Sequence, residues 1–162
     1  ALREAPDVVL IGEVRDRDTI EACLNLSGTG HLAISTLHSN NSYQTLQRIV
    51  SMYPQDAREQ LYMDLSLNLQ AIVSQRLVKG KDGKRVAAVE ILINTPYIAE
   101  LILKGNVEGV REAMADSTQS QGMLTFDDSL FALCKDGIIE QAEALNNADS
   151  RDNLENRFAF GN

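Results

Sequence analysis

The feature that most constrains the fold of this chain is a short apolar run near its start that ends directly in an acid. The run VVLI covers residues 8–11, and Gly12 and Glu13 follow it. A short continuous run of branched apolar residues is typical of a strand in a parallel sheet that is covered on both faces. We therefore predict a fully buried strand over residues 8–11 that fixes the position of the Glu13 carboxylate.

The residues after this strand predict a strand–helix–strand unit. Residues 15–27 are expected to form a helix, because Asp16 and Asp18 lie where acids favour a helix start and the apolar residues share one face. A second buried strand is expected over residues 32–36, after a glycine-containing turn. The loop after each strand is short, so the unit predicts parallel strands joined by a right-handed crossover.

A hairpin is expected in the middle of the chain, between helical segments. The sequence KGKDGK is rich in Gly and Lys and separates QRLV from RVAAVEILI, which predicts two antiparallel strands. Before the hairpin we expect helices over residues 42–50 and 55–75, separated by Pro54. A polar tail is expected to end the chain at Asn162. Between Pro96 and this tail the pattern predicts short helices over residues 97–104, about 108–117, 125–135 and about 140–147.

Composition argues against several kinds of partner. The net charge of −8 disfavours an unassisted surface for nucleic acid or anionic membranes, since both need clustered Lys and Arg. No apolar run in the sequence approaches the roughly 20 residues of a membrane span, and no signal peptide is recognisable.

Cys23 and Cys134 are interpreted as reduced thiols of a cytosolic protein, with a disulfide as the alternative. Because the chain starts at Ala1 and its first strand follows almost at once, we expect it to be the later part of a longer protein.

Polar residues that follow the two predicted strands suggest a ligand site. Ligands of open α/β sheets bind beyond the carboxyl ends of the strands, where Glu13 and Asp16 leave the first strand. Thr36 and His38 leave the second strand at the same edge. An apolar strand that ends in Glu is typical of a Walker B element, whose carboxylates hold Mg²⁺, directly or through water, and orient or deprotonate the attacking water. The alternative is a solvated acid before a helix start.

Two histidines flank the second predicted strand. His31 precedes it and His38 follows it, and an imidazole there could hydrogen-bond a γ-phosphate or a neighbouring loop and so sense the nucleotide state. Thr36, at the end of the strand, is a candidate for the same sensing role. Alternatively, His31 caps the strand and His38 is a surface loop residue. We predict no zinc site, because no acid or thiol accompanies the histidines at metal-ligand spacing.

Four arginines are candidates for a charge supplied across a subunit boundary. An arginine in this role stabilises developing phosphate charge, and the candidates are Arg3, Arg15, Arg17 and Arg76. A solvated arginine is the alternative at each position. The chain contains no GxxxxGK[ST], the loop that cradles phosphates. If the protein is a nucleotide hydrolase, this loop lies upstream of Ala1, and the present chain alone is expected to bind nucleotide poorly.

Four collinear stretches resemble the secretion ATPases, and most closely the type IV pilus retraction ATPases of the PilT/PilU family. They are ALREAPDVVLIGEVRDRDTIE, TGHLAISTLHSNN, QRLVKGKDGKRVAAVEILINTP and GMLTFDDSL, and the resemblance spans nearly all of the chain. In that family the first stretch is the Walker B region and the second is the His box. The resemblance implies that Glu13 is the catalytic carboxylate and that His31 and His38 lie near the nucleotide.

Further features place the chain within the superfamily. Assembly and type II secretion members carry a four-cysteine insertion soon after QRL, whereas here QRLVKGKDGKRVAAVEIL contains no cysteine, which favours a retraction-type member. DLSLNLQAIVSQRL and ALNNADSRDNL are more similar to the PilU branch than to the PilT branch. YIAELILK departs from the AIRNLIRE motif of the PilT branch, which leaves open whether the protein retracts pili by itself or as an accessory motor.

The fold class implied is α/β: the back half of a RecA-like P-loop NTPase core over residues 1–95, then an all-helical C-terminal region over residues 96–162. The resemblance implies a homo-hexamer at the cytoplasmic face of the inner membrane that uses ATP and Mg²⁺ to power pilus retraction and twitching motility. Its implied partners are a membrane platform protein and a paralogous retraction ATPase. The alternatives are a non-catalytic interaction module on an NTPase scaffold, a type II secretion or pilus assembly ATPase, and a DNA-packaging or conjugation ATPase, which would need a basic pore.

Overall fold

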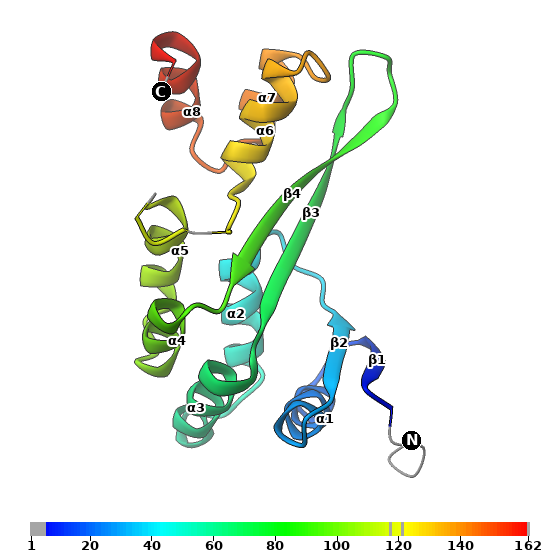
Figure 1. Ribbon diagram of the computed structural model, residues 1–162, viewed down its shortest axis with the longest axis vertical. Helices are drawn as coiled ribbons and strands as arrows, with labels where there is room; N and C mark the ends of the chain where they lie inside the picture. Colours follow the sequence, from blue (N-terminus) through cyan, green and yellow to red (C-terminus); the bar gives the residue numbers. More distant parts are fainter. Residues whose placement is uncertain (1–5, 117, 121, 162) are drawn as a thin grey trace.

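The chain folds into helices arranged around a parallel strand pair and a long hairpin (Figure 1). The computed structural model describes residues 6–116, 118–120 and 122–161. Arg3, and Ser117 as the predicted end of a helix, lie outside the described residues. The elements are β1 (Val8–Glu13), α1 (Arg17–Gly28), β2 (Leu32–Thr36), α2 (Ser42–Ser51), a 3₁₀ helix (Gln55–Ala57), α3 (Arg58–Asn68), β3 (Ala71–Lys79), β4 (Arg85–Ile93), α4 (Pro96–Leu103), α5 (Val107–Ala115), α6 (Phe126–Lys135), α7 (Gln141–Asn147) and α8 (Arg151–Phe160).

The predicted strand–helix–strand unit is confirmed. β1 and β2 pair in parallel, with Val8 opposite Leu32 and Glu13 opposite Thr36. The crossover helix α1 starts where it does because the Asp16 carboxylate accepts hydrogen bonds from the backbone N–H and the hydroxyl of Thr19. The carboxyl ends of both strands therefore meet at one edge of the sheet.

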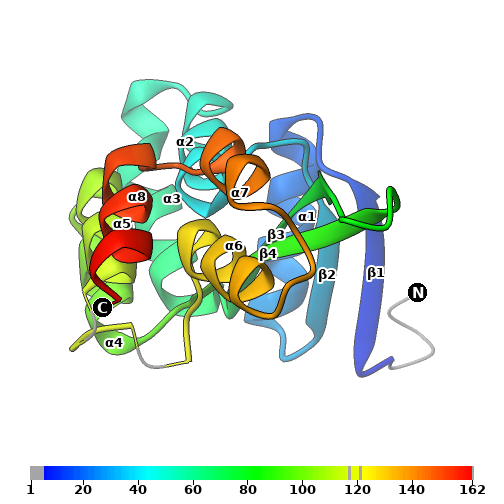
Figure 2. The same cartoon turned by 90° about the horizontal axis from the view of Figure 1, so that it is seen from above.

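The prediction that these strands are fully buried was wrong. Side chains along β1 and β2 alternate between more and less exposed positions. Helix α1 packs against both strands, and Figure 2 shows β1 at the edge of the molecule, beyond β2. One face of the pair is open among the described residues, and Leu10 is 75 % exposed. The large apolar side chains exposed in this strand pair are Val8, Leu10, Leu32 and Ile34.

The predicted hairpin is confirmed, but it starts earlier than expected. The β3–β4 ladder runs from the Ala71–Ile93 pair to the Lys79–Arg85 pair. The single helix predicted over residues 55–75 was wrong, because a 3₁₀ turn precedes α3 and the chain is extended from Ala71 onward. The side-chain amide of Asn94 donates to backbone carbonyls at the end of α3 and just beyond it, which stabilises the turn into β3.

Helical segments after Pro96 occur as predicted, as α4 to α7. The segment expected as a polar tail contains a further helix, α8, over residues 151–160. This helix is attached by a fully buried Leu154, by a Phe158 ring 5.1 Å from the Phe131 ring, and by an ion pair of 2.6 Å between Arg157 and Asp128. In the described residues, no helix combines the length and the apolar character needed to cross a membrane.

The buried apolar residues form two clusters. The larger cluster joins α1–α5 to Leu92, and the smaller one joins α6–α8 to Val78 and Ala88 of the hairpin. Figure 1 shows both groups of helices along the hairpin, with α6–α8 near its turn and α2–α5 near its other end. The division into domains at residues 95 and 96 stays a prediction.

A buried carboxylate connects the hairpin to α2. Glu90 of β4 is 6 % exposed, and its Oε1 accepts a hydrogen bond of 2.6 Å from the backbone N–H of Ser42. The Ser42 hydroxyl lies 3.4 Å from that of Ser74 on β3. Burial raises the pKa of Glu90 above its ordinary value of 4.5, because a buried carboxylate loses water contacts.

We expect Glu90→Gln to change the pH dependence of stability. Between the unfolded and the raised folded pKa of Glu90, the folded state binds more protons, so wild-type stability falls as pH rises through this window. Gln keeps an acceptor for Ser42 and does not titrate. The free energy of unfolding of the variant should therefore rise relative to that of wild type as the pH increases above 4.5. Urea titrations across this range measure the difference. Glu59→Gln, at an exposed position on α3, is the matched control, and parallel curves for Glu90→Gln and wild type would contradict the assignment.

Candidate functional site

Glu13 lies at the carboxyl end of β1, where strand pairing places it opposite Thr36. Its Oε2 accepts hydrogen bonds of 2.8 and 2.6 Å from Nε and Nη2 of Arg15. Its Oε1 lies 3.4 Å from Nε2 of His38 in the loop after β2. The Glu13 side chain is 26 % exposed, so it remains accessible to solvent. The structure thus brings Glu13, Arg15, Thr36 and His38 to one sheet edge.

The electrostatic surroundings of Glu13 favour its charged form. The hydrogen bond from Arg15 is the main cause that lowers the pKa of the Glu13 carboxyl, and the positive charges of Arg15, His38 and Arg48 act in the same direction. An ionised carboxylate can accept a proton from water or hold a hydrated cation. Glu13 is therefore the carboxylate at this edge that can act as a base or hold a hydrated cation.

The loop that carries His38 is held by contacts with α2. The His38 carbonyl accepts a hydrogen bond of 2.7 Å from Nη1 of Arg48, and Asn41 caps α2 by accepting from the Gln44 N–H. An open groove of about 800 Å³ runs along this loop and the exposed side of α2. It is lined by His38, Ser39, Asn40, Gln44, Gln47, Arg48 and Ser51.

Arg48 is a residue that the sequence reasoning missed. An arginine within a helix is usually solvated, and nothing local marks it as part of a site. The usable signal was its spacing, because Arg48 follows the helix cap Asn41 by two turns and so lies on the same helix face. From that face the Arg48 guanidinium reaches the loop of His38.

Thr36 and Asp16 make contacts that are mainly structural. The Thr36 hydroxyl donates weakly to the Gly12 carbonyl at 3.4 Å, and the Thr36 carbonyl accepts from the Val14 N–H. Asp16 caps α1, and its bonds to Thr19 lower the pKa of its carboxyl. A nucleotide-sensing role for Thr36 and a catalytic role for Asp16 stay predictions.

The two histidines lie at opposite ends of β2. Leu32 pairs with Val8 at the start of the sheet, so His31 lies a strand length, about 16 Å, from the edge that carries Glu13. The His31 Nδ1 lies 3.0 Å from the Thr29 hydroxyl and 3.3 Å from the Leu26 carbonyl. His31 thus closes the turn between α1 and β2, and of the two histidines the structure brings His38 to Glu13.

The candidate arginines differ in their surroundings. Arg15 is exposed and contacts Glu13, whereas Arg17 forms an ion pair of 2.6 Å with Glu21 and lies over the Tyr53 ring. Arg76 is partly buried, and its guanidinium forms hydrogen bonds and an ion pair with groups from two other segments of the chain. A role for Arg76 across a subunit boundary would require these contacts to break.

The residues near Glu13 suit magnesium held by few protein ligands. Mg²⁺ keeps several waters and binds through one or two carboxylates together with substrate phosphates. Glu13 offers one ionised, accessible carboxylate. Among the described residues, no group of three His, Cys, Asp or Glu side chains is arranged to hold a metal ion.

Comparison with known proteins places this strand edge in a family context. The profile of the type II/IV secretion system proteins matches residues 1–124, a range that includes both strands and the loop of His38. The chain belongs to the type II/IV secretion system protein family.

Family members with curated names extend the similarity along the chain. The type IV pilus ATPase PilU of Pseudomonas aeruginosa is 48% identical over 161 residues, which are 99% of this chain and 42% of that protein. PilT of the same organism, named a type IV pilus retraction ATPase, is 39% identical over 154 residues, which are 95% of this chain and 44% of that protein. The chain spans about two fifths of the length of these relatives.

The fold is that of a solved family structure. The crystal structure of the pilus retraction motor PilT with bound ADP superposes with a TM-score of 0.83 at 38% identity. The similarity covers 96% of this chain and 43% of that one. The α/β class with a helical C-terminal region is therefore confirmed.

We expect Arg15→Gln to raise the pKa of Glu13 toward its ordinary value, because it removes the hydrogen bond that most lowers this pKa. An NMR titration of the Glu13 carboxyl carbon measures the change. Arg17→Gln is the matched control, since Arg17 pairs with Glu21 and should leave the Glu13 titration unchanged. An unchanged pKa in Arg15→Gln would show that the ion pair is not formed in solution.

Proposed function

We propose that the whole protein is an ATPase motor that powers type IV pilus retraction and twitching motility. The observation that carries this proposal is the ionised Glu13 carboxylate at the end of β1, with His38 approaching it from β2. The collinear 48% identity to a pilus ATPase and the likeness to an ADP-bound retraction motor support it.

Glu13 is the general base of the proposed reaction. A carboxylate with a lowered pKa is ionised at neutral pH and can orient the attacking water and accept its proton. Magnesium would supply charge neutralisation on the phosphates, with Glu13 holding it through water. His38 lies at the groove and beside Glu13, so it can report a change at the phosphates to the loop before α2.

We further propose that the protein works as a hexamer at the cytoplasmic face of the inner membrane, on a platform protein of the pilus machine. A ring would let Arg15 or Arg17 act on a nucleotide held by a neighbouring subunit, since both are exposed near the same edge. Pseudomonas aeruginosa carries both PilU and PilT, and the chain is more identical to PilU. This supports action beside a paralogous retraction ATPase.

We expect Glu13→Gln in the whole protein to lower ATP turnover by about 10²- to 10⁴-fold, the usual contribution of a general base. Nucleotide binding should persist, because the substitution keeps the shape of the side chain. A phosphate-release assay together with binding of a fluorescent ADP analogue separates the two effects. Glu59→Gln on α3 is the control and should turn over ATP like wild type.

The outcome of the Glu13→Gln experiment also separates the motor from the alternative of a non-catalytic module. If wild type hydrolyses ATP and Glu13→Gln matches it, Glu13 is not the base and the proposed mechanism fails. If wild type itself shows no turnover above background, the protein is an interaction module on an NTPase scaffold.

A further inference from the structure

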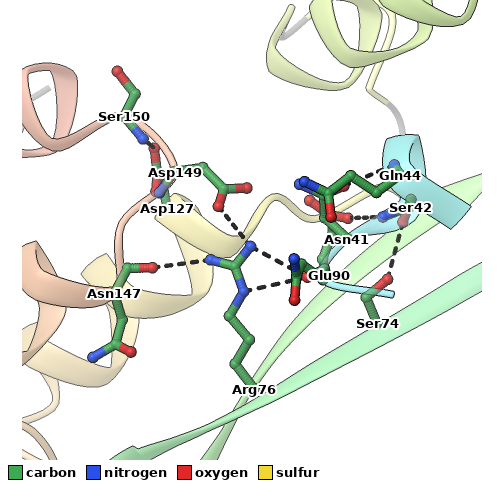
Figure 3. A network of polar contacts seen from close by, with 11 residues as sticks. Asn41, Ser42, Gln44, Ser74, Arg76, Glu90, Asp127, Asn147, Asp149 and Ser150 are labelled. Carbon is green, nitrogen blue, oxygen red and sulfur yellow. Dashed lines mark hydrogen bonds and ion pairs between the residues drawn. The ribbon is translucent and has the colours of Figure 1, made fainter. Parts of the chain in front are cut away.

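Arg76 occupies an unusual position on the inner face of β3. Its Nε and Nη2 donate to the Asn40 carbonyl at 3.3 and 3.2 Å, and its Nη1 donates to the Asn147 carbonyl at 3.0 Å. Its Nη2 also forms an ion pair of 2.6 Å with Asp149. The guanidinium lies over the Phe126 ring, 3.9 Å from its centroid. Figure 3 shows Arg76 between the segment of Asn147 and Asp149 on one side and the start of α2 on the other.

The chemistry of this contact requires arginine. A guanidinium presents five N–H donors in a rigid plane, whereas the lysine ammonium is a compact charge on a flexible stem. The Arg76 side chain is only 22 % exposed; each of its three nitrogens donates to an acceptor, and the plane lies over a ring. One side chain therefore fixes two backbone segments relative to each other, separated in sequence by more than a hundred residues.

The C-terminal side of this contact is firmly held. Asp127, in the first turn of α6, accepts hydrogen bonds from the backbone N–H groups of Asp149 and Ser150 at 2.8 and 3.0 Å. Asp149 is therefore fixed through its backbone to α6 and through its carboxylate to Arg76. The connection between α7 and α8 cannot shift without disturbing one of these contacts.

The other side of the contact leads to the candidate site. Asn40 lies two residues after His38 and directly before Asn41, the cap of α2. The same loop is held by Arg48, which donates to the His38 carbonyl. A displacement of the Asn40 carbonyl therefore reaches His38, whose ring lies 3.4 Å from Glu13.

We propose that Arg76, paired with Asp149, is a positioning residue that couples the His38–Asn41 loop to the C-terminal helices α7 and α8. This inference rests on the proposed function, because it assigns the loop to a nucleotide site. Arg76 touches the backbone of the loop and the C-terminal connection, so it acts through His38. A change at the nucleotide moves the loop, and Arg76 carries the displacement to the helices.

The kinetic test compares Arg76→Met, Arg76→Lys and Asp149→Asn in the whole protein. We expect Arg76→Met to lower kcat by about tenfold and to leave KM within about twofold, since misplacing a catalytic group mainly affects the chemical step. Arg76→Lys should rescue little, because lysine cannot reproduce the planar fork. Asp149→Asn keeps the side-chain shape, removes the ion pair, and should have a smaller effect of the same kind. Arg85→Met is the matched control, since Arg85 is exposed and donates to Leu77 within the hairpin.

A second readout separates coupling from mere stabilisation. Hydrogen exchange of the backbone amides of Asp149 and Ser150 should change when ADP is added to wild type. In Arg76→Met this response should be lost, while ADP still binds. A lowered melting temperature with wild-type kcat and a wild-type exchange response would make Arg76 a structural brace and overturn the proposal, as would an absent response in wild type.

The outcomes remain distinguishable from a failure of the proposed function. If Glu13→Gln abolishes turnover and the Arg76 variants match wild type, the coupling alone is wrong. If wild-type protein shows no turnover, or Glu13→Gln keeps it, the proposed function fails, and the exchange measurement with ADP decides the coupling by itself. Should Arg76→Met fail to fold, Asp149→Asn decides: loss of the ADP response supports the coupling, and a wild-type response overturns it.

Discussion

The parallel register of β1 with β2 is the constraint on which the candidate site depends. Backbone pairing places Glu13 opposite Thr36, so the chain that leaves β2 must pass the carboxylate two residues later, at His38. The same register sends His31 to the far end of the sheet. Side-chain contacts then refine this geometry, because Arg15 hydrogen-bonds the Glu13 carboxylate and lowers its pKa, and Arg48 holds the loop. Altering the register would separate the acid from the histidine.

The inner face of the hairpin explains why the chain has two apolar clusters. Its cross-strand pairs are apolar near the ends, Ile72 with Leu92 and Val78 with Val86, and polar between them, where Ser74 pairs with Glu90. Arg76 adds a charge beside them. Buried polar groups are costly unless they are hydrogen-bonded, and here they bond to α2 and to the C-terminal connection. The polar middle thus separates the two cores and fixes how their helices meet.

Local patterns predicted much of this structure. The apolar run, the acids before α1 and the Gly- and Lys-rich turn predicted the parallel unit and the hairpin. Interactions between distant residues explain the errors: Asn94 stabilises the turn before β3, and Asp128 binds Arg157 on a helix with little apolar periodicity. Within the site, Glu13 and His38 follow from strand ends. The pairing of Arg76 with Asp149 does not follow from the sequence, because no local pattern relates β3 to the segment between α7 and α8.

The unbroken β3–β4 ladder has a mechanical consequence. Its hydrogen bonds resist bending together, so the strand pair is a stiff beam rather than a flexible linker. Near its turn the Lys81 N–H donates to the Ile138 carbonyl, and at the other end Asn94 is tied to α3. Glu90 and Arg76 attach the middle of the hairpin to the neighbouring segments. A displacement of the C-terminal helices would therefore rotate the hairpin as one rigid unit. A small rotation about its middle would move the two ends of the hairpin furthest.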